Sequence, residues 1–298
     1  MSRQRKVVVF VAITFVASWT LAVSFAALGV RWGTPAAAAL AMLFVMPPAF
    51  AALVVAGPLA KESVMEQLGL RLRPNRWWLV AWLLPAALVG LTVVIGAAMP
   101  GASLDTSLEG FVAFYGEHVP AEHMAELERQ ARESAAAGFH PLLRMAVQAM
   151  VAGASLNAVV ALGEELGWRG LLHHALASGF WRRSTTVGLI WGVWYAPLVV
   201  MGHNYPDHPA AGVPLMVAWC VLMSPSIAYV RERSGSVLAA GVLHGTLNAL
   251  AGLPPIATRG GSDLTTGVTG AAGFVAAAIV LVVLLAHDRY VAAERIAV

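Results

Sequence analysis

Apolar residues fill most of the chain in long runs, and short polar segments separate these runs. We identify eight runs of about 20 residues, near positions 7–29, 35–57, 77–98, 142–163, 187–203, 212–230, 236–256 and 268–287. An α-helix of this length rises about 30 Å, which matches the hydrocarbon core of a bilayer. The pattern predicts an all-α, polytopic membrane protein of about eight transmembrane helices, with residues 1–298 forming a single integral membrane domain. The pair Pro47–Pro48 predicts a kink in the second helix.

The composition agrees with this pattern and excludes other classes of protein. Of the 298 residues, 59% are hydrophobic and only 12% are charged, whereas soluble domains carry about 25% charged residues. The net charge of +3 does not indicate a nucleic-acid partner, because the basic residues lie at the ends of apolar runs rather than in a patch. The lone Cys220 excludes an intramolecular disulfide. The first apolar run is too long for a signal peptide, so we expect it to be retained as a helix.

Lys and Arg residues are divided unevenly between the two sides of the predicted bundle. With the N-terminus inside, 14 of the 19 basic residues fall on the inner side. The outer side holds Arg31, Arg129, Arg132, Arg144 and Arg259. Because basic residues concentrate in cytoplasmic loops, we expect both termini in the cytoplasm and the protein in the plasma membrane of a prokaryote.

The longest outer segment, about 99–141, is acidic. It contains Asp105, Glu109, Glu117, Glu122, Glu126, Glu128 and Glu133. Its stretch "PAEHMAELERQARESAAAG" has helical periodicity, with Pro120 near the start and Gly138 near the end. A solvated loop that carries a helix is the favoured interpretation, and a cap over a substrate site is the alternative.

Four groups of polar residues interrupt the apolar runs or lie at their edges. They are Glu164 with Glu165 and Arg169, Tyr195, His203 with Asn204, and His244 with Asn248. Ionisable residues at membrane depth usually face a bundle interior or a water-filled cavity. For the glutamates and the last pair we favour a functional role. The third group is followed by "YPDHP", which is typical of an outer loop, so there a structural role is favoured.

Helical spacing gives the two glutamates different roles. Glu165 and Arg169 are four residues apart and can form an ion pair on one helical face. Glu164 points about 100° away, so it is free to act as a general base. His244 and Asn248 also share a face, and both can donate hydrogen bonds to a developing oxyanion.

The surroundings of these residues indicate a shared cavity. Gly241 and Gly245 would let another helix or a substrate approach closely. Tyr195 and His244 each lie about eight residues, or about 12 Å, from the inner ends of their runs. These depths predict a polar cavity that opens toward the cytoplasm.

Three motifs occur in order on separate runs. They are E-E-x-x-x-R ("EELGWR", 164–169), an element similar to aromatic-x-x-x-His in "WGVWYAPL" (191–198) with Tyr195 at its last position, and H-x-x-x-N ("HGTLN", 244–248). Together they resemble the CPBP intramembrane proteases, also called the CAAX protease and bacteriocin-processing, or Abi, family. The motif-bearing core spans about 140–256, and the rest of the chain is similar mainly in hydropathy.

The resemblance implies an eight-helix protease that cleaves membrane-associated or prenylated, CAAX-like proteins or peptides in or near the bilayer. In this interpretation Glu164 activates water, while Glu165 and Arg169 support it. His244 and Asn248 stabilise the oxyanion. Family naming mentions a metalloprotease, which is the one reason to consider zinc. The sequence has no H-E-x-x-H pair, so we expect neither a metal nor another cofactor.

The middle motif departs from the family pattern, because Tyr195 stands where its histidine is expected. A tyrosine hydroxyl can orient water or substrate but is a poor base at neutral pH. His203 lies about 12 Å further along an unbroken helix and is not expected to replace it. His173 and His174 are a weaker second choice on the inner side.

Two alternatives to an active protease remain open at this stage. One is a catalytically impaired pseudoprotease that binds membrane peptides or partner proteins. The other is a small transporter or channel in which the buried carboxylates relay protons. No repeat relates the two halves of the chain, although many transporter folds contain one.

Overall fold

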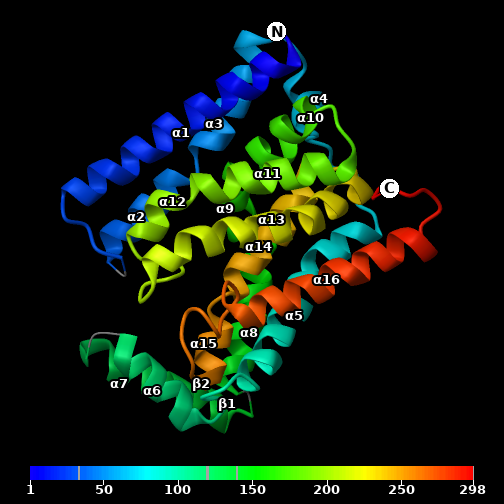
Figure 1. Ribbon diagram of the computed structural model, residues 1–298. Coiled ribbons are helices and arrows are strands. Elements are labelled where there is room, and N and C mark those ends of the chain that lie inside the picture. Colours follow the sequence, from blue (N-terminus) through cyan, green and yellow to red (C-terminus); the bar gives the residue numbers. More distant parts are fainter. Residues whose placement is uncertain (33, 119–120, 139, 298) are drawn as a thin grey trace.

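A computed structural model describes residues 1–32, 34–118, 121–138 and 140–297 of the chain (Figure 1). The first part of the chain forms α1 (Arg3–Ala27), α2 (Pro35–Phe44), α3 (Pro47–Val54), the π-helical η1 (Val55–Leu59), α4 (Val64–Leu68) and α5 (Arg76–Ala97). The segment after α5 forms β1 (Ala102–Leu104), α6 (Leu108–His118) and α7 (Ala121–Ala136). Pro120, predicted near the start of this last helix, lies outside the described residues.

The second part of the chain carries the sequence motifs. It forms α8 (Pro141–Gly153), α9 (Leu156–Glu165), the π-helical η2 (Leu166–Leu172), α10 (His173–Ala175), α11 (Phe180–Trp194), α12 (Ala196–Val200) and α13 (Pro209–Ser234). It continues with α14 (Val237–Leu250), α15 (Leu253–Ala257), β2 (Thr258–Gly260) and α16 (Ala271–Tyr290). The protein is therefore an all-α polytopic membrane protein, apart from the short antiparallel pair β1–β2.

The number of spans differs from the predicted eight. Within the described ranges, six helices are long and apolar enough to cross a bilayer, and the pair α8 and α9–α10, bent by 51°, makes a seventh if it is one span. The predicted fifth span is broken at Tyr195 into α11 and α12. Pro197 explains the break, because it donates no backbone hydrogen bond and its ring clashes with the preceding helical turn.

Prolines and glycines shape the helices that position the site. At the predicted kink the regular helix is interrupted, since α2 ends at Phe44 and α3 begins at Pro47, although both belong to one span, Pro35–Leu59. Helix α14 packs between α9 and α5 in the centre of the molecule (Figure 1). A Cβ atom on Gly245 would lie 2.4 Å from the backbone nitrogen of Ala158 in α9. The predicted close helix approach at this glycine is thus confirmed.

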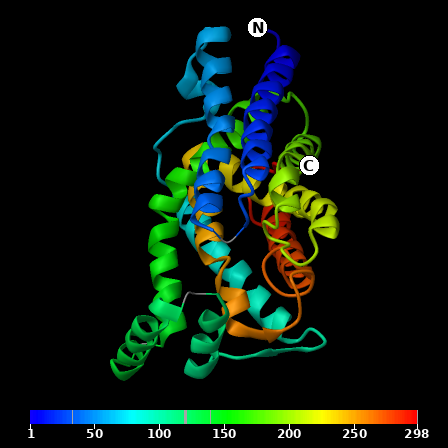
Figure 2. The ribbon, with the colours of Figure 1, turned by 90° about the vertical axis from the view of Figure 1, so that its left-hand side faces the viewer.

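One end of the molecule gathers both termini, and we call it the termini end (residues 1–6, 60–75, 173–183, 231–236 and 287–297). There the Asn75 side chain donates a hydrogen bond to the Ser234 carbonyl, and the Val237 amide donates one to the Gly69 carbonyl. Figures 1 and 2 show the two chain ends on the same side of the bundle, away from α6, α7 and the strands.

The opposite end, which we call the sheet end, contains residues 28–32, 98–118, 121–138, 201–208 and 251–270. The Arg259 guanidinium lies 2.9 Å from Asp105 across the β1–β2 pair. Hydrogen bonds from Ser107 and Arg259 lower the pKa of Asp105 to about 2. His208 lies 2.6 Å from Asp263, and this contact joins residues 201–208 to residues 251–270.

Candidate active site

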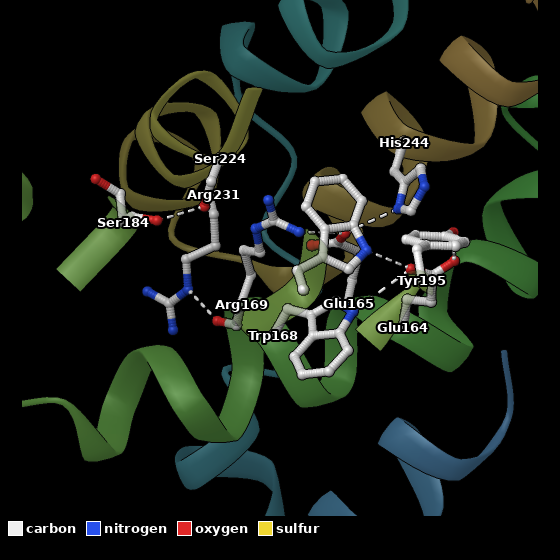
Figure 3. A network of polar contacts seen from close by, with 10 residues as sticks. Glu164, Glu165, Trp168, Arg169, Ser184, Tyr195, Ser224, Arg231 and His244 are labelled. Atoms are coloured by element: carbon white, nitrogen blue, oxygen red, sulfur yellow. Dashed lines mark hydrogen bonds and ion pairs between the residues drawn. The ribbon is translucent and has the colours of Figure 1, made fainter. Parts of the chain in front are cut away.

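The two adjacent glutamates lie where α9 passes into η2, deep in the helix bundle (Figure 3). Glu164 is 2% exposed and Glu165 is fully buried. Charged side chains are almost never buried to this extent unless they are paired. Short π-helical segments such as η2 also occur frequently at functional sites, so this junction is the first place to examine for chemistry.

Glu165 forms the predicted ion pair and adds a second partner from α14. The Nη1 atom of Arg169 donates to Glu165 Oε1 at 2.9 Å, and His244 Nδ1 lies 2.9 Å from the same oxygen. The guanidinium also lies over the ring of Trp191, 4.5 Å from its centroid. A carboxylate beside Nδ1 fixes the imidazole proton on that nitrogen. The Nε2 atom of His244 is therefore the nitrogen left for other chemistry.

Glu164 accepts hydrogen bonds on both of its carboxylate oxygens. The Tyr195 hydroxyl donates to Oε1 at 2.8 Å, and the Trp191 indole donates to Oε2 at 2.7 Å. The Trp168 indole approaches Oε2 at 3.4 Å. The donors come from α11 and η2, so the carboxylate is held from two directions (Figure 3).

The two tryptophans that hold Glu164 were missed by the sequence analysis. A helical-spacing signal for both was present, because Trp168 lies four residues after Glu164 and Trp191 lies four residues before Tyr195. An indole N–H is a donor without an acceptor function. Each tryptophan therefore suits the support of a carboxylate, in addition to filling the apolar core.

A cavity of about 590 Å³ collects most of the predicted site residues. Glu164, Tyr195, His244 and Asn248 all line it, whereas Glu165 lies behind it. Its volume is within the range of about 300–1,000 Å³ that is common for ligand sites. The structure thus brings the residues of the three motifs to one cavity, with one glutamate facing it and the other serving the histidine.

His203 also lines the cavity, although on an unbroken helix it would lie too far from Tyr195 to take its place. The helix ends at Val200, and Gly202, with φ of 101°, turns the chain back. The imidazole stacks on the Tyr195 ring with centroids 5.7 Å apart and an interplanar angle of 19°. The distance of about 12 Å holds only for an unbroken helix, and the break between α11 and α12 removes that condition.

The second choice, His173 and His174, is not brought to this cavity. His173 contacts Glu232 at 3.1 Å, and both histidines line a separate pocket at the termini end with Arg183. His173 belongs to a group of polar contacts that joins α10 to α11 and α13. Neither histidine contacts Glu164 or Glu165 through any bond that the structure describes.

The cavity extends toward the sheet end rather than toward the termini end. Beyond Asn248 its lining continues to Pro206, Asp263 and residues 266–269. On the side of the termini end, Trp168 and Leu172 of η2 are fully buried and do not belong to the lining. The lining residues therefore lie toward the side opposite to the predicted opening. Counting depth along single helices could not reveal that large side chains of η2 fill the inner part of the bundle.

The described side chains around the cavity do not provide the ligands of a zinc site. Among the residues that the structure describes, no group of three or more His, Cys, Asp or Glu side chains is arranged to hold a metal ion. Catalytic zinc usually takes three protein ligands, and Glu165 already contacts Arg169 and His244. The residues present do not fit zinc.

The fold and site define a class: an integral membrane protein with a buried, supported carboxylate that faces a cavity in the helix bundle. Residues 146–250 match the family model for type II CAAX prenyl endopeptidase Rce1-like proteins. The match covers about a third of the chain, includes all three motifs, and confirms the resemblance to the CAAX protease family, whose name implies a protease. No curated protein matches the chain.

Proposed function

We propose that the protein is an intramembrane endopeptidase in which Glu164 activates water for attack on a peptide bond. The observation that carries this proposal is the difference between the two glutamates. Glu164 lines the cavity and accepts hydrogen bonds from Trp191 and Tyr195, whereas Glu165 is occupied by Arg169 and His244. One carboxylate can therefore take a proton from water while the other orients the histidine.

The hydrolytic step needs a base, a nucleophile and a proton for the leaving amine. In the proposed step Glu164 takes a proton from a water molecule, and the resulting hydroxide attacks the carbonyl carbon of the peptide bond. When the tetrahedral intermediate collapses, the C–N bond breaks and protonated Glu164 returns the proton to the amine nitrogen. Tyr195 and Trp191 hold the carboxylate so that one oxygen keeps a fixed direction toward the cavity.

The oxyanion of the intermediate needs hydrogen-bond donors that are already in place. The Asn248 amide is one such donor, and His244 Nε2 is the other when the imidazole is protonated. Glu165 balances the positive charge of that imidazolium from the Nδ1 side, at 2.9 Å. Arg169 in turn fixes Glu165. Arg169 acts through Glu165, so it is a positioning residue. Removal of one partner from a buried ion pair typically costs about 3–5 kcal/mol.

The substrate class follows from the family and the setting. A site inside a bilayer protein selects peptides that are anchored in the membrane by a transmembrane segment or by a lipid. CAAX-like, prenylated substrates are suggested by the family description alone. The cavity itself combines apolar side chains such as Leu247 with the polar groups of the site. This combination suits an extended peptide, because the backbone groups of such a peptide need hydrogen-bond partners.

The test uses the purified full chain in liposomes with a panel of single-span peptides, whose fragments are identified by mass spectrometry. Glu164→Gln keeps the size of the side chain but removes the base, and we expect cleavage to fall by at least about 100-fold. Glu66→Gln, at an exposed position on α4, is the matched control and should cleave like the wild type. Equal cleavage by Glu164→Gln would exclude Glu164 as the base. Binding without cleavage by the wild type would favour a pseudoprotease.

A further inference from the structure

We infer that the cavity opens to the outer face of the membrane, so the site acts on outer, juxtamembrane segments of membrane-anchored proteins. Three independent features of the chain carry this inference: the charge of its two ends, the closed inner side of the cavity and the helices around its open side. The statement about orientation stands by itself. The statement about substrates rests on the proposed proteolytic function.

The charge distribution indicates which end faces the cytoplasm. Most Lys and Arg residues lie at or beside the termini end, including Arg3, Arg5, Lys61, Arg71, Arg73, Arg182, Arg183, Arg231, Arg233, Arg289 and Arg295. The sheet end has four basic residues, Arg31, Arg129, Arg132 and Arg259, among which Arg129 is paired with Glu126 and Glu133 in α7. The excess of basic residues on one side sets the orientation of a membrane protein. The termini end is thus the cytoplasmic end.

The inner side of the cavity is closed by tight packing around η2. A Cβ atom on Gly167 would lie 2.8 Å from both Phe10 and Pro48, so α1 and α3 contact the helix backbone there. Trp168 packs edge-on against Phe10 with ring centroids 5.5 Å apart. At the termini end, the Arg231 side chain donates a hydrogen bond to the backbone carbonyl of Arg169. A peptide on the cytoplasmic side therefore meets packed side chains rather than the site.

The open side of the cavity faces the outer loops and, at one wall, the lipid. The outer lining is formed by residues of two loops of the sheet end, including Asn204 and Asp263. Met42 of α2 also lines the cavity, and 51% of its surface is exposed. A protein anchored in the bilayer beside α2 can thus bring the segment above its outer membrane boundary to Glu164. A lipid-modified tail on the cytoplasmic surface would meet the closed end.

Cysteine labelling in intact cells tests the orientation. The natural Cys220 is buried, so the wild type should not react and gives a clean background. Thr266→Cys places a thiol in the cavity lining, and Leu72→Cys places one on an exposed part of the termini end. Both substitutions leave the charge distribution unchanged. The reagent is a maleimide that does not cross membranes.

We expect Thr266→Cys to be labelled in intact cells and Leu72→Cys only after the membrane is permeabilised. The reverse pattern overturns the inference, and so does labelling of both or of neither in intact cells. Labelling of Leu72→Cys after permeabilisation also shows that the protein is inserted in the membrane, because its thiol must react once the reagent can enter the cell. This result does not depend on proteolysis.

A cleavage experiment then tests the substrate class. Two single-span reporters carry the same library of ten-residue segments, one on the outer and one on the inner side of the span. Cleavage of the outer reporter alone, lost in Glu164→Gln, is expected, and cleavage of the inner reporter alone overturns the substrate class. If neither reporter is cut, the proposed protease function fails, while the labelling result still decides the orientation.

Discussion

Glu164 and Glu165 are adjacent in the chain, yet their surroundings differ in every respect that matters for chemistry. Glu165 shares one oxygen between Arg169 and His244, and Glu164 receives three hydrogen-bond donors at the wall of the cavity. Helical spacing was sufficient to predict the ion pair, because i and i+4 residues meet on any helix. The donors to Glu164 were not predictable in the same way, since the partner from α11 is set by how two helices pack.

The contribution of Trp191 can be measured by removing its N–H group alone. Trp191→Phe keeps an aromatic ring below Arg169 and beside His244 but loses the 2.7 Å hydrogen bond to Glu164. A hydrogen bond to a charged group contributes about 1.5–3 kcal/mol, so the cleavage rate should fall by about 10- to 100-fold. Trp82→Phe removes a similar indole hydrogen bond, to the carbonyl of Met150, and should leave the rate unchanged. Equal rates for the two variants would contradict the role of Trp191.

Tyr195 is the position where the chain departs from the family motif. Its hydroxyl contacts Glu164 at 2.8 Å, and a tyrosine is a poor base near neutral pH. Tyr195→His should therefore raise the cleavage rate, while Tyr195→Phe should lower it, both measured with the same single-span peptides in liposomes. If Tyr195→His brings no gain, this chain uses a different arrangement, and the neighbouring His203 is the next residue to examine.

Helix breaks, rather than helices, account for most of the difference between the expected and the observed site. The runs of apolar residues predicted where helical segments would occur, because hydropathy and length are read directly from the sequence. They did not predict the bend between α8 and α9 or the π-helical turns of η2. The break before Pro197 moved His203 from a distant loop to the cavity. Such breaks depend on which neighbouring groups can bind the freed backbone atoms.

The contact between α14 and α9 is the element-scale feature most easily tested. Gly245→Ala would place a methyl group 2.4 Å from the Ala158 nitrogen, so the helices must move apart, and overpacking of this kind costs about 1–3 kcal/mol. We expect a lower apparent Tm in detergent micelles. Gly90→Ala is the matched control, since a Cβ atom at Gly90 meets no atom within 4 Å. Equal Tm values for the two variants would show that this approach is not tight.

Each end of the molecule brings together loops that are far apart in the sequence. The count of basic residues divides the loops into two groups, and the structure has contacts within each group, such as Asn75 to Ser234 and Asp105 to Arg259. The direction of the cavity was not predictable, because it depends on which side chains fill the bundle on either side of Glu164. An outer opening would separate this chain from an enzyme that processes cytoplasmic tails.

Hydrolysis that depends on Glu164 is tested most directly by the isotopic composition of the cleavage products. The purified protein in liposomes is supplied with single-span peptides in water enriched in oxygen-18, and the fragments are weighed by mass spectrometry. The wild type should give two fragments for each cut, with one oxygen-18 atom in the new carboxyl group, and Glu164→Gln should give none. Labelled fragments in equal amounts from both proteins would contradict the central role of Glu164.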